Sequence, residues 1–392
     1  MTVPVVIIGS GFAAYQLIKN IRRQDTELPI LVITADNGDE YNKPDLSHVF
    51  SKEQDADALI LLSATDFAAQ QQVEIVTNTR VDSIDTKMQS LDAGGQTYHY
   101  AKLVFATGAS AFVPPIKGEG KGSVITLNSL SEYRGSQAVL SRATRILLMG
   151  GGLIGTELAM DLQASGKEVV VVEPSSRLLA NVAPDFVALK LEHTLLDAGM
   201  TLALNDTVST IDLSTANSLI ENDAELKKQE LTVTTSAARR FEVDCVISAA
   251  GLRPNTQLAQ QAGLEVRHGI VVDERLNTSA ENVYALGDCA EINGKVMAYL
   301  QPIILSANAL AKQLLGQMSQ LTLPPMMVKV KTPTYPIQVG GHFSADSSWK
   351  VGFDKLGVIA EAYDELNNMT GFVVTDENAK QAFSLLRKVS AA

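Results

Sequence analysis

Two glycine-rich turns, each between an apolar run and a helical pattern, constrain this 392-residue chain more than any other feature. The first follows the β-branched run at 5–8 and has the form Gly-x-Gly-x-x-Ala at 9–14. In such a turn the first glycine permits the bend, the second lets a pyrophosphate approach, and the small third residue lets the helix pack on the strand. The helix N-terminus favours an anion. We therefore predict a dinucleotide site, with Asp36 after the next strand as acceptor for a ribose hydroxyl.

The second turn has the form Gly-x-Gly-x-x-Gly at 150–155 and follows the apolar run at 145–149. Glu173 ends the next predicted strand, 23 positions after the first glycine of the turn, near the spacing of a ribose-binding acid. One glycine-rich turn also occurs for packing reasons alone, whereas two with trailing acids favour two bound dinucleotides. Glu173 would repel a 2′-phosphate, so the pattern predicts NADH rather than NADPH, although Arg177 just beyond could partly offset the repulsion.

Net charge, apolar runs and cysteine content limit the partners and the location that we expect for this chain. The net charge of −12 argues against nucleic acid and anionic membranes as partners. The chain has no apolar run of transmembrane length and no basic region before its first apolar run, so we expect no membrane insertion and no signal peptide. Two cysteines, Cys245 and Cys289, imply no disulfide framework, and a cytoplasmic location is the default.

The segment 45–52 reads as the start of a short helix on which His48 and Lys52 share a face. The pair is either a cationic wall beside a bound anion or a solvated helix end, and the pattern leaves both open. From Pro324 onward the chain reads as strands followed by a helix at about 377–388. We therefore expect an α/β protein with two Rossmann-like dinucleotide-binding domains and a C-terminal α+β domain.

These motifs resemble the two-dinucleotide flavoprotein reductases of the glutathione-reductase-like superfamily. Besides the two turns, the resemblance rests on Ala106-Thr107-Gly108, on Gly251-Leu252-Arg253-Pro254-Asn255 and on Gly287-Asp288. Within that superfamily the chain is most similar to rubredoxin reductases of alkane-oxidising bacteria, through Tyr41-x-Lys43-Pro44-x-Leu46-Ser47 and the segments at 33–36, 50–57 and 284–291.

The resemblance implies non-covalent FAD in a discontinuous domain, 1–112 and 245–323, NADH in 113–244, and a C-terminal domain at 324–392. The FAD residues it implies are Gly9, Gly11, Phe12, Ala13, Ala14, Asp36, Lys43, Pro44, Val81, Ala106, Thr107, Gly108, Gly287, Asp288 and Pro302. The NADH residues are Gly150, Gly152, Leu153, Ile154, Gly155, Glu173, Arg177, Ala250 and Gly251. No metal ligands are expected.

Disulfide-reducing relatives carry Cys-x4-Cys or Cys-x2-Cys, and neither spacing occurs here. The resemblance therefore implies that electrons leave the flavin directly and that no acid or base catalyst is required. Ferredoxin-reductase relatives pair a lysine near the flavin with a glutamate. The glutamate is present as Glu157, but His48 replaces the lysine. Whether a lysine–glutamate pair forms near the flavin is therefore open. Lys52 is a candidate substitute for the lysine, and Glu157, His48 and Lys52 are the residues expected in the flavin environment.

The predicted function is an FAD-dependent NADH:rubredoxin oxidoreductase that supplies an alkane hydroxylase. The alternative is a ferredoxin reductase of a dioxygenase or cytochrome P450 system. A redox-sensing interaction protein similar to apoptosis-inducing factor is a further alternative. We rank it lower, because it would need a long C-terminal insertion or a targeting segment and we expect neither in this sequence. Docking of a small acidic rubredoxin requires a local positive patch, for which the candidates are Lys43, Lys52, Lys329 and Lys331.

Overall fold

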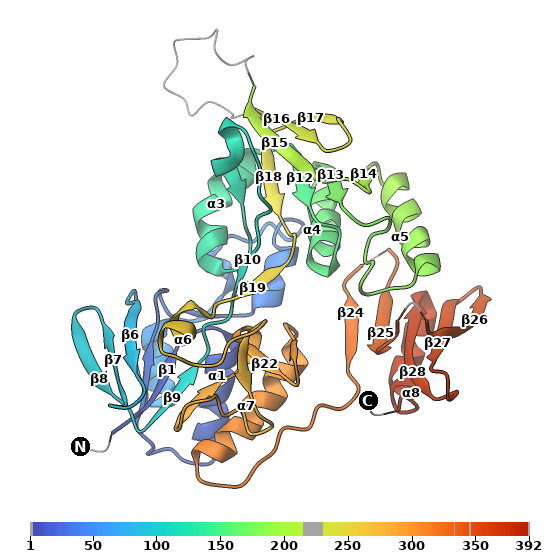
Figure 1. Ribbon diagram of the computed structural model, residues 1–392. Coiled ribbons are helices and arrows are strands. Elements are labelled where there is room, and N and C mark those ends of the chain that lie inside the picture. The colour runs from blue at the N-terminus through green and yellow to red at the C-terminus, as the bar shows by residue number, and fades with distance from the viewer. Residues whose placement is uncertain (1–2, 215–229, 333, 345, 391–392) are drawn as a thin grey trace, which may run out of the picture. The chain divides into compact units, whose positions relative to one another are not determined.

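The computed structural model describes residues 3–214, 230–332, 334–344 and 346–390. The chain forms two compact units, each assembled from segments far apart in sequence (Figure 1). The first unit contains Met1–Lys43, Asp57–Ser110 and Leu252–Leu323, and the second contains Pro44–Ala56, Ala111–Gly251 and Pro324–Ala392.

Five parallel strands form the central sheet of the first unit, in the order β21-β9-β1-β2-β5. β1 lies in the middle, with Ile8 opposite Ile33 on one side and Phe105 on the other. All of β1 is buried, as an apolar run in a parallel sheet covered on both faces must be. The strands are β1 (Val5–Ile8), β2 (Ile30–Ile33), β5 (Glu74–Val76), β9 (Lys102–Phe105) and β21 (Val283–Ala285).

Helices and small sheets complete the first unit. α1 (Phe12–Arg22) packs against α7 (Leu300–Leu314), while α2 (Ala64–Gln71) and α6 (Gln257–Gln261) are shorter. The antiparallel strands β6 (Val81–Asp85), β7 (Ser90–Ala93) and β8 (Gln96–His99) form a separate sheet. The remaining strands are β3 (Glu40–Tyr41), β4 (Ile60–Leu62), β10 (Ala109–Ala111), β19 (Leu252–Pro254), β20 (Ile270–Val272), β22 (Ala290–Ile292) and β23 (Lys295–Val296).

The second unit repeats the parallel arrangement with the order β11-β18-β12-β13-β14. These strands are β11 (Val124–Ile125), β12 (Arg145–Met149), β13 (Glu168–Glu173), β14 (Thr201–Leu204) and β18 (Cys245–Ser248). The helices of this part are α3 (Leu130–Arg142), α4 (Leu153–Ala164) and α5 (Asp185–Asp197). An antiparallel sheet contains β15 (Val208–Leu213), β16 (Leu231–Thr235) and β17 (Arg240–Val243).

The strand β18, which begins at the predicted domain boundary at residue 245, was assigned to the wrong domain. β18 is parallel to β12, with Ile146 opposite Cys245, so it belongs to the second sheet and not to the first domain. Its four residues are buried, and a buried parallel strand needs partners on both edges; β11 supplies the other. The segment Pro44–Ala56 also belongs to the second unit. The other predicted domain boundaries remain predictions.

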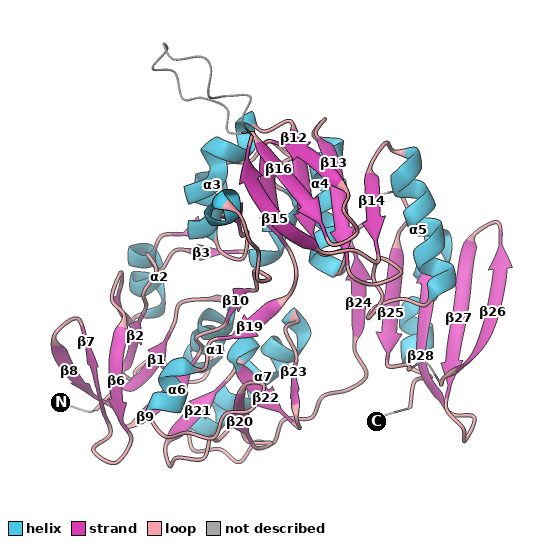
Figure 2. Cartoon of the chain, turned by 45° about the horizontal axis from the view of Figure 1, so that its top comes forward, coloured by secondary structure: helices cyan, strands magenta, loops and turns pink. Residues whose placement is uncertain are grey.

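An antiparallel sheet in the order β24-β25-β28-β27-β26 forms the C-terminal part of the second unit (Figure 2). Its strands are β24 (Met327–Val330), β25 (Ile337–Gly341), β26 (Ser348–Asp354), β27 (Gly357–Tyr363) and β28 (Met369–Thr375). Phe372 and Val374 of β28 pack with Ala382 and Leu385 of the short helix α8 (Ala382–Leu386). The predicted helix at 377–388 is instead a 3₁₀ segment, Asp376–Gln381, followed by α8.

The predicted α/β class is confirmed, with two Rossmann-like sheets and a C-terminal α+β part. Within the described residues, no helix is both long and apolar enough to cross a membrane.

Candidate functional site

The first glycine-rich turn joins β1 to α1 as predicted. Gly9 has a φ of 108°, and a Cβ there would collide with the carbonyl oxygen of Ala106, so only glycine fits. Gly11 is the N-cap of α1 and makes no side-chain cap. A Cβ on Gly11 would meet no described atom within 4 Å. The helix N-terminus therefore faces open space, which fits a pyrophosphate.

Gly287 and Asp288 lie beside this helix end. A Cβ on Gly287 would lie 2.8 Å from the Cβ of Ala13, so the Gly-Asp pair packs against the first turn of α1. The Asp288 side chain is 14% exposed, and its carboxylate lies 3.7 Å from Lys43 Nζ. Burial raises the pKa of Asp288, and the charge of Lys43 only partly offsets this. The arrangement fits a polyol chain that donates hydroxyl hydrogens to the carboxylate.

Thr107 is held by a residue that the site prediction missed, Asn255. The Thr107 hydroxyl donates to the carbonyl of Asn255 at 2.8 Å, and Asn255 Nδ2 donates to the carbonyl of Thr107 at 2.8 Å. Asn255 thus joins the end of β9 to the segment after β19. Its place in the quoted Gly-Leu-Arg-Pro-Asn motif was the available signal.

The second glycine-rich turn has the same construction between β12 and α4. Gly150 has a φ of 104°, and a Cβ there would lie 2.6 Å from the carbonyl oxygen of Ala249. A Cβ on Gly155 would collide with the Gly150 carbonyl, so the helix packs directly on the turn. Gly152 caps α4, and its missing Cβ has no neighbour within 4 Å among the residues described. This second helix end also fits a pyrophosphate.

Glu173 ends β13 beside this turn and is 8% exposed. Its carboxylate accepts the N–H of Gly151 at 2.6 Å and the N–H of Ser175 at 2.8 Å. A carboxylate has about four lone-pair sites, so Glu173 retains capacity for a ribose hydroxyl. The ribose contact remains a prediction.

Glu157, on α4, is the centre of a buried polar cluster and is 4% exposed. Its carboxylate accepts the Ser47 hydroxyl at 3.0 Å and the backbone N–H of Lys331 at 2.9 Å. His48 Nε2 lies 3.8 Å from the carboxylate and is buried without a hydrogen-bond partner in the described part of the chain. Burial, followed by the charge of Lys331, lowers the pKa of His48 despite the opposing effect of Glu157. The lowered pKa favours the neutral form of the His48 ring.

The helix predicted at 45–52 does not form as expected, because Lys43–His48 is a 3₁₀ segment followed by turns. Lys52 is exposed, and Lys331 contacts Glu157 through its backbone N–H. The Lys331 ammonium donates to the carbonyl of Pro44 at 3.1 Å. Whether these residues form the flavin environment remains a prediction.

Asp161, one turn after Glu157 on α4, was not predicted as a site residue. It is 5% exposed and accepts the N–H of Phe50 at 2.7 Å and the N–H and hydroxyl of Ser51. Two acids four positions apart in an otherwise apolar helix were the signal, since a buried carboxylate requires partners.

The remaining predicted cofactor residues lie in or next to the same elements, and their contacts with cofactor remain predictions. They are Phe12, Ala13 and Ala14 in α1, Asp36 after β2, Val81 in β6, Ala106 and Gly108 after β9, Pro302 in α7, Leu153 and Ile154 in α4, and Ala250 and Gly251 after β18. In the described ranges, no group of three His, Cys, Asp or Glu residues is placed to bind a metal.

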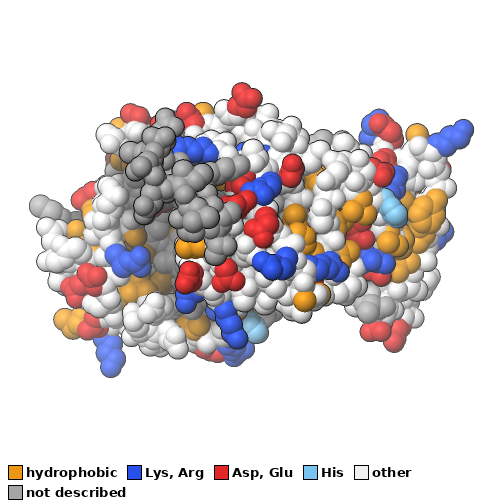
Figure 3. Space-filling model, turned by 90° about the horizontal axis from the view of Figure 1, so that it is seen from above, with side chains coloured by type: hydrophobic (Ala, Val, Ile, Leu, Met, Phe, Trp, Pro, Cys, Tyr) orange, Lys and Arg blue, Asp and Glu red, His pale blue; other side chains and the backbone are white. Residues whose placement is uncertain are grey.

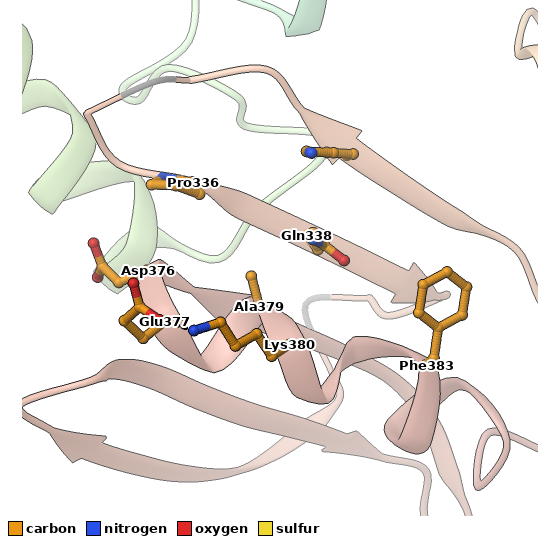
Figure 4. A pocket seen from close by; sticks show the side chains of 8 residues that line it. Pro336, Gln338, Asp376, Glu377, Ala379, Lys380 and Phe383 are labelled. Carbon is orange, nitrogen blue, oxygen red and sulfur yellow. Dashed lines mark hydrogen bonds and ion pairs between the residues drawn. The ribbon is translucent and has the colours of Figure 1, made fainter.

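The C-terminal sheet has a hollow lined by both strands and helices (Figure 4). Lys329 and Gln338 contribute from β24 and β25, and Lys380 and Phe383 from the 3₁₀ segment and α8. Phe383 is 69% exposed and adds an apolar side chain to the border of this hollow. Of the four predicted docking lysines, Lys43 and Lys331 have the partners described above, whereas Lys329 borders this hollow.

Comparison with protein-family models defines the class. Residues 3–309 match the pyridine nucleotide-disulphide oxidoreductase family, and residues 320–389 match the rubredoxin binding C-terminal domain. The chain belongs to this oxidoreductase family. It is an NADH-dependent flavoprotein reductase that acts on a rubredoxin-type partner.

Curated relatives match over the whole length. The chain is 53% identical over 390 residues to a nitric oxide reductase FlRd-NAD(+) reductase of Vibrio vulnificus strain YJ016, covering 100% of this chain and 99% of the relative. It is 54% identical over 391 residues to the protein of the same name from Aliivibrio fischeri strain ATCC 700601 / ES114, with the same coverage.

Solved structures share the fold. The putidaredoxin reductase–putidaredoxin covalent complex matches with a TM-score of 0.86 and 22% identity, covering 99% of this chain and 94% of that chain. The ferredoxin reductase for the CYP199A2 system from Rhodopseudomonas palustris matches with a TM-score of 0.86 and 23% identity, covering 100% and 96%.

Proposed function

We propose that this chain transfers electrons from NADH through FAD to the rubredoxin centre of a flavorubredoxin that reduces nitric oxide. The observation that carries the proposal is full-length similarity, at 53% identity, to a protein named nitric oxide reductase FlRd-NAD(+) reductase. The match of residues 320–389 to a rubredoxin binding domain supports the same class of partner. A cytoplasmic location, expected from the sparse cysteines, is part of this proposal.

The two glycine turns support the cofactor assignments. When bound, FAD supplies the conversion of a two-electron hydride donor into single electrons for an iron–sulfur partner. Gly11 and Asp288 hold the pyrophosphate and polyol ends of FAD in the first unit. Gly152 and Glu173 hold the pyrophosphate and ribose of NADH in the second. The protein's contribution is binding and orientation, because hydride transfer requires no acid or base.

The two thiols have the properties of packing residues. Both Cys245 and Cys289 are buried, and burial raises the pKa of Cys245 to about 12. Burial also raises the pKa of Cys289. Thiols with raised pKa values are poor nucleophiles at pH 7, which supports direct electron transfer from flavin to partner.

The alkane hydroxylase predicted from the sequence has no support in the comparisons, since the relatives' names concern nitric oxide reduction. The ferredoxin reductases among the solved structures are at most 23% identical and support only the fold.

An anaerobic reconstitution tests the proposal. The reductase, NADH and a purified flavorubredoxin are mixed, and NADH oxidation is followed after addition of nitric oxide. A rubredoxin of an alkane hydroxylase system replaces flavorubredoxin in the parallel assay, with excess oxidised cytochrome c as its terminal acceptor, because rubredoxin itself does not reduce nitric oxide. We expect kcat/KM to be about tenfold higher with flavorubredoxin, a typical margin for a matched electrostatic interface. Preference for the alkane-system rubredoxin would contradict the proposal.

A further inference from the structure

The loop after β13 folds back onto the second glycine turn. A Cβ on Gly151 would collide with the Leu178 side chain, and the N–H of Leu179 donates to the Gly151 carbonyl at 2.9 Å. The N–H of Gly151 in turn donates to Glu173. The loop therefore lies directly against the turn that fits the NADH pyrophosphate, and Arg177 lies in this loop.

A second carboxylate, Glu192 of α5, holds the same loop. Its side chain is 7% exposed, and Oε1 accepts the N–H of Leu178 at 2.9 Å. The other oxygen lies 3.8 Å from Arg177 Nη1, and Nη1 also donates to the carbonyl of Ser176 at 2.9 Å. Arg177 Nε is buried and has no hydrogen-bond partner within the described ranges. The Arg177 guanidinium therefore lies near the Glu192 carboxylate of α5, and its Nε keeps an unused hydrogen-bond donor.

We propose that Glu192 is a specificity-determining residue that selects NADH over NADPH by neutralising Arg177. The inference rests on the NADH site of the proposed function. Glu173 repels a 2′-phosphate directly, whereas Glu192 acts on the one cation of the loop that could compensate. Glu173, Glu192 and Arg177 together carry one net negative charge, and replacement of Glu192 by glutamine brings this charge to zero.

Glutamine is the informative replacement. Its amide oxygen can still accept the N–H of Leu178, so the loop keeps its backbone anchor while the charge is lost. Arg177 is then free to bind a 2′-phosphate, for which a guanidinium is well suited.

The test measures binding without turnover, by calorimetry on the FAD-loaded protein. The probes are ADP-ribose and 2′-phospho-ADP-ribose, which both contain the pyrophosphate and differ only in the 2′-phosphate. We expect Glu192→Gln to tighten binding of 2′-phospho-ADP-ribose about tenfold, the scale of one charge interaction near a protein surface, and to change binding of ADP-ribose less than about twofold. The NADPH-to-NADH ratio of kcat/KM should rise in parallel, through KM.

Two further variants make the test specific. Glu192→Gln combined with Arg177→Ala should lose the gain, because the responding cation is gone. Glu168→Gln removes an exposed charge at the opposite end of β13 and should have no effect. An unchanged preference in Glu192→Gln, or a gain that survives loss of Arg177, would overturn the inference. Failure of the wild type to bind ADP-ribose would instead overturn the site itself, and the proposed function with it.

Discussion

The Ser47 hydroxyl donates to the Glu157 carboxylate at 3.0 Å across 110 positions of sequence. The same carboxylate accepts the backbone N–H of Lys331. One buried acid therefore joins three segments of the second unit: the segment at 44–56, helix α4 and the end of β24.

Glu157→Ala should lower the free energy of unfolding by about 3 kcal/mol, because the Ser47 hydroxyl and the Lys331 N–H lose a buried acceptor. Urea unfolding followed by circular dichroism measures the change. Glu168→Ala, at an exposed glutamate, is the matched control. Equal midpoints for the two variants would show that the cluster does not stabilise the fold.

His48 should titrate below its ordinary pKa of 6.5. At pH values below about 6.5, His48 binds more protons in the unfolded chain than in the folded one. Protonation of His48 therefore lowers the free energy of unfolding as the pH falls below 6.5, and the folded state is favoured above that pH. Histidine ring signals in NMR titrations give the midpoint, and the signal that disappears in His48→Gln assigns it among the five histidines. A His48 midpoint at or above 6.5 would contradict the cluster's geometry.

Paired glycine variants separate folding from cofactor binding in the first unit. Gly9→Ala should destabilise the protein by more than about 2 kcal/mol, because φ is positive and the Cβ collides with Ala106. Gly11→Val should fold normally but lose FAD, because its side chain enters the open space at the helix end. The flavin released on denaturation reports FAD binding, and we expect one FAD per wild-type chain. The melting temperature reports stability. Full FAD content in Gly11→Val would remove the pyrophosphate from that position.

Local patterns were sufficient to predict both glycine turns, the place of Glu173 at the end of β13 and the parallel sheets around them. A strand, a turn and a helix adjacent in sequence carry their own signals. Long-range partnerships were not predictable in this way. A buried strand such as β18 has the same pattern in either sheet, and only its pairing with β12 assigns it. Lys331 was predicted as a docking residue, and its contact with Glu157 depends on how β24 packs.

Lys329 is a cleaner docking test than Lys331, whose charge reversal would disturb the Glu157 cluster. Acidic and basic side chains are interspersed on the face in Figure 3, so attraction of an acidic partner must come from a local group. Lys329→Glu should slow reduction of a rubredoxin-type partner about threefold at low salt and leave flavin reduction by NADH unchanged. Lys355→Glu, in the exposed turn between β26 and β27, is the control. An equal effect of both variants would place docking elsewhere.

The most direct test of the central claim separates the two half-reactions under anaerobic conditions. Stopped-flow mixing with NADH should bleach the flavin absorbance. Mixing the reduced protein with at least two equivalents of an isolated rubredoxin domain should restore it, because each iron centre accepts one of the two flavin electrons. A plant-type ferredoxin serves as the competing acceptor in a matched experiment. We predict that rubredoxin is reduced about tenfold faster or more, as expected for the partner that the C-terminal domain matches. Equal or faster reduction of ferredoxin, or no transfer to rubredoxin, would contradict the account.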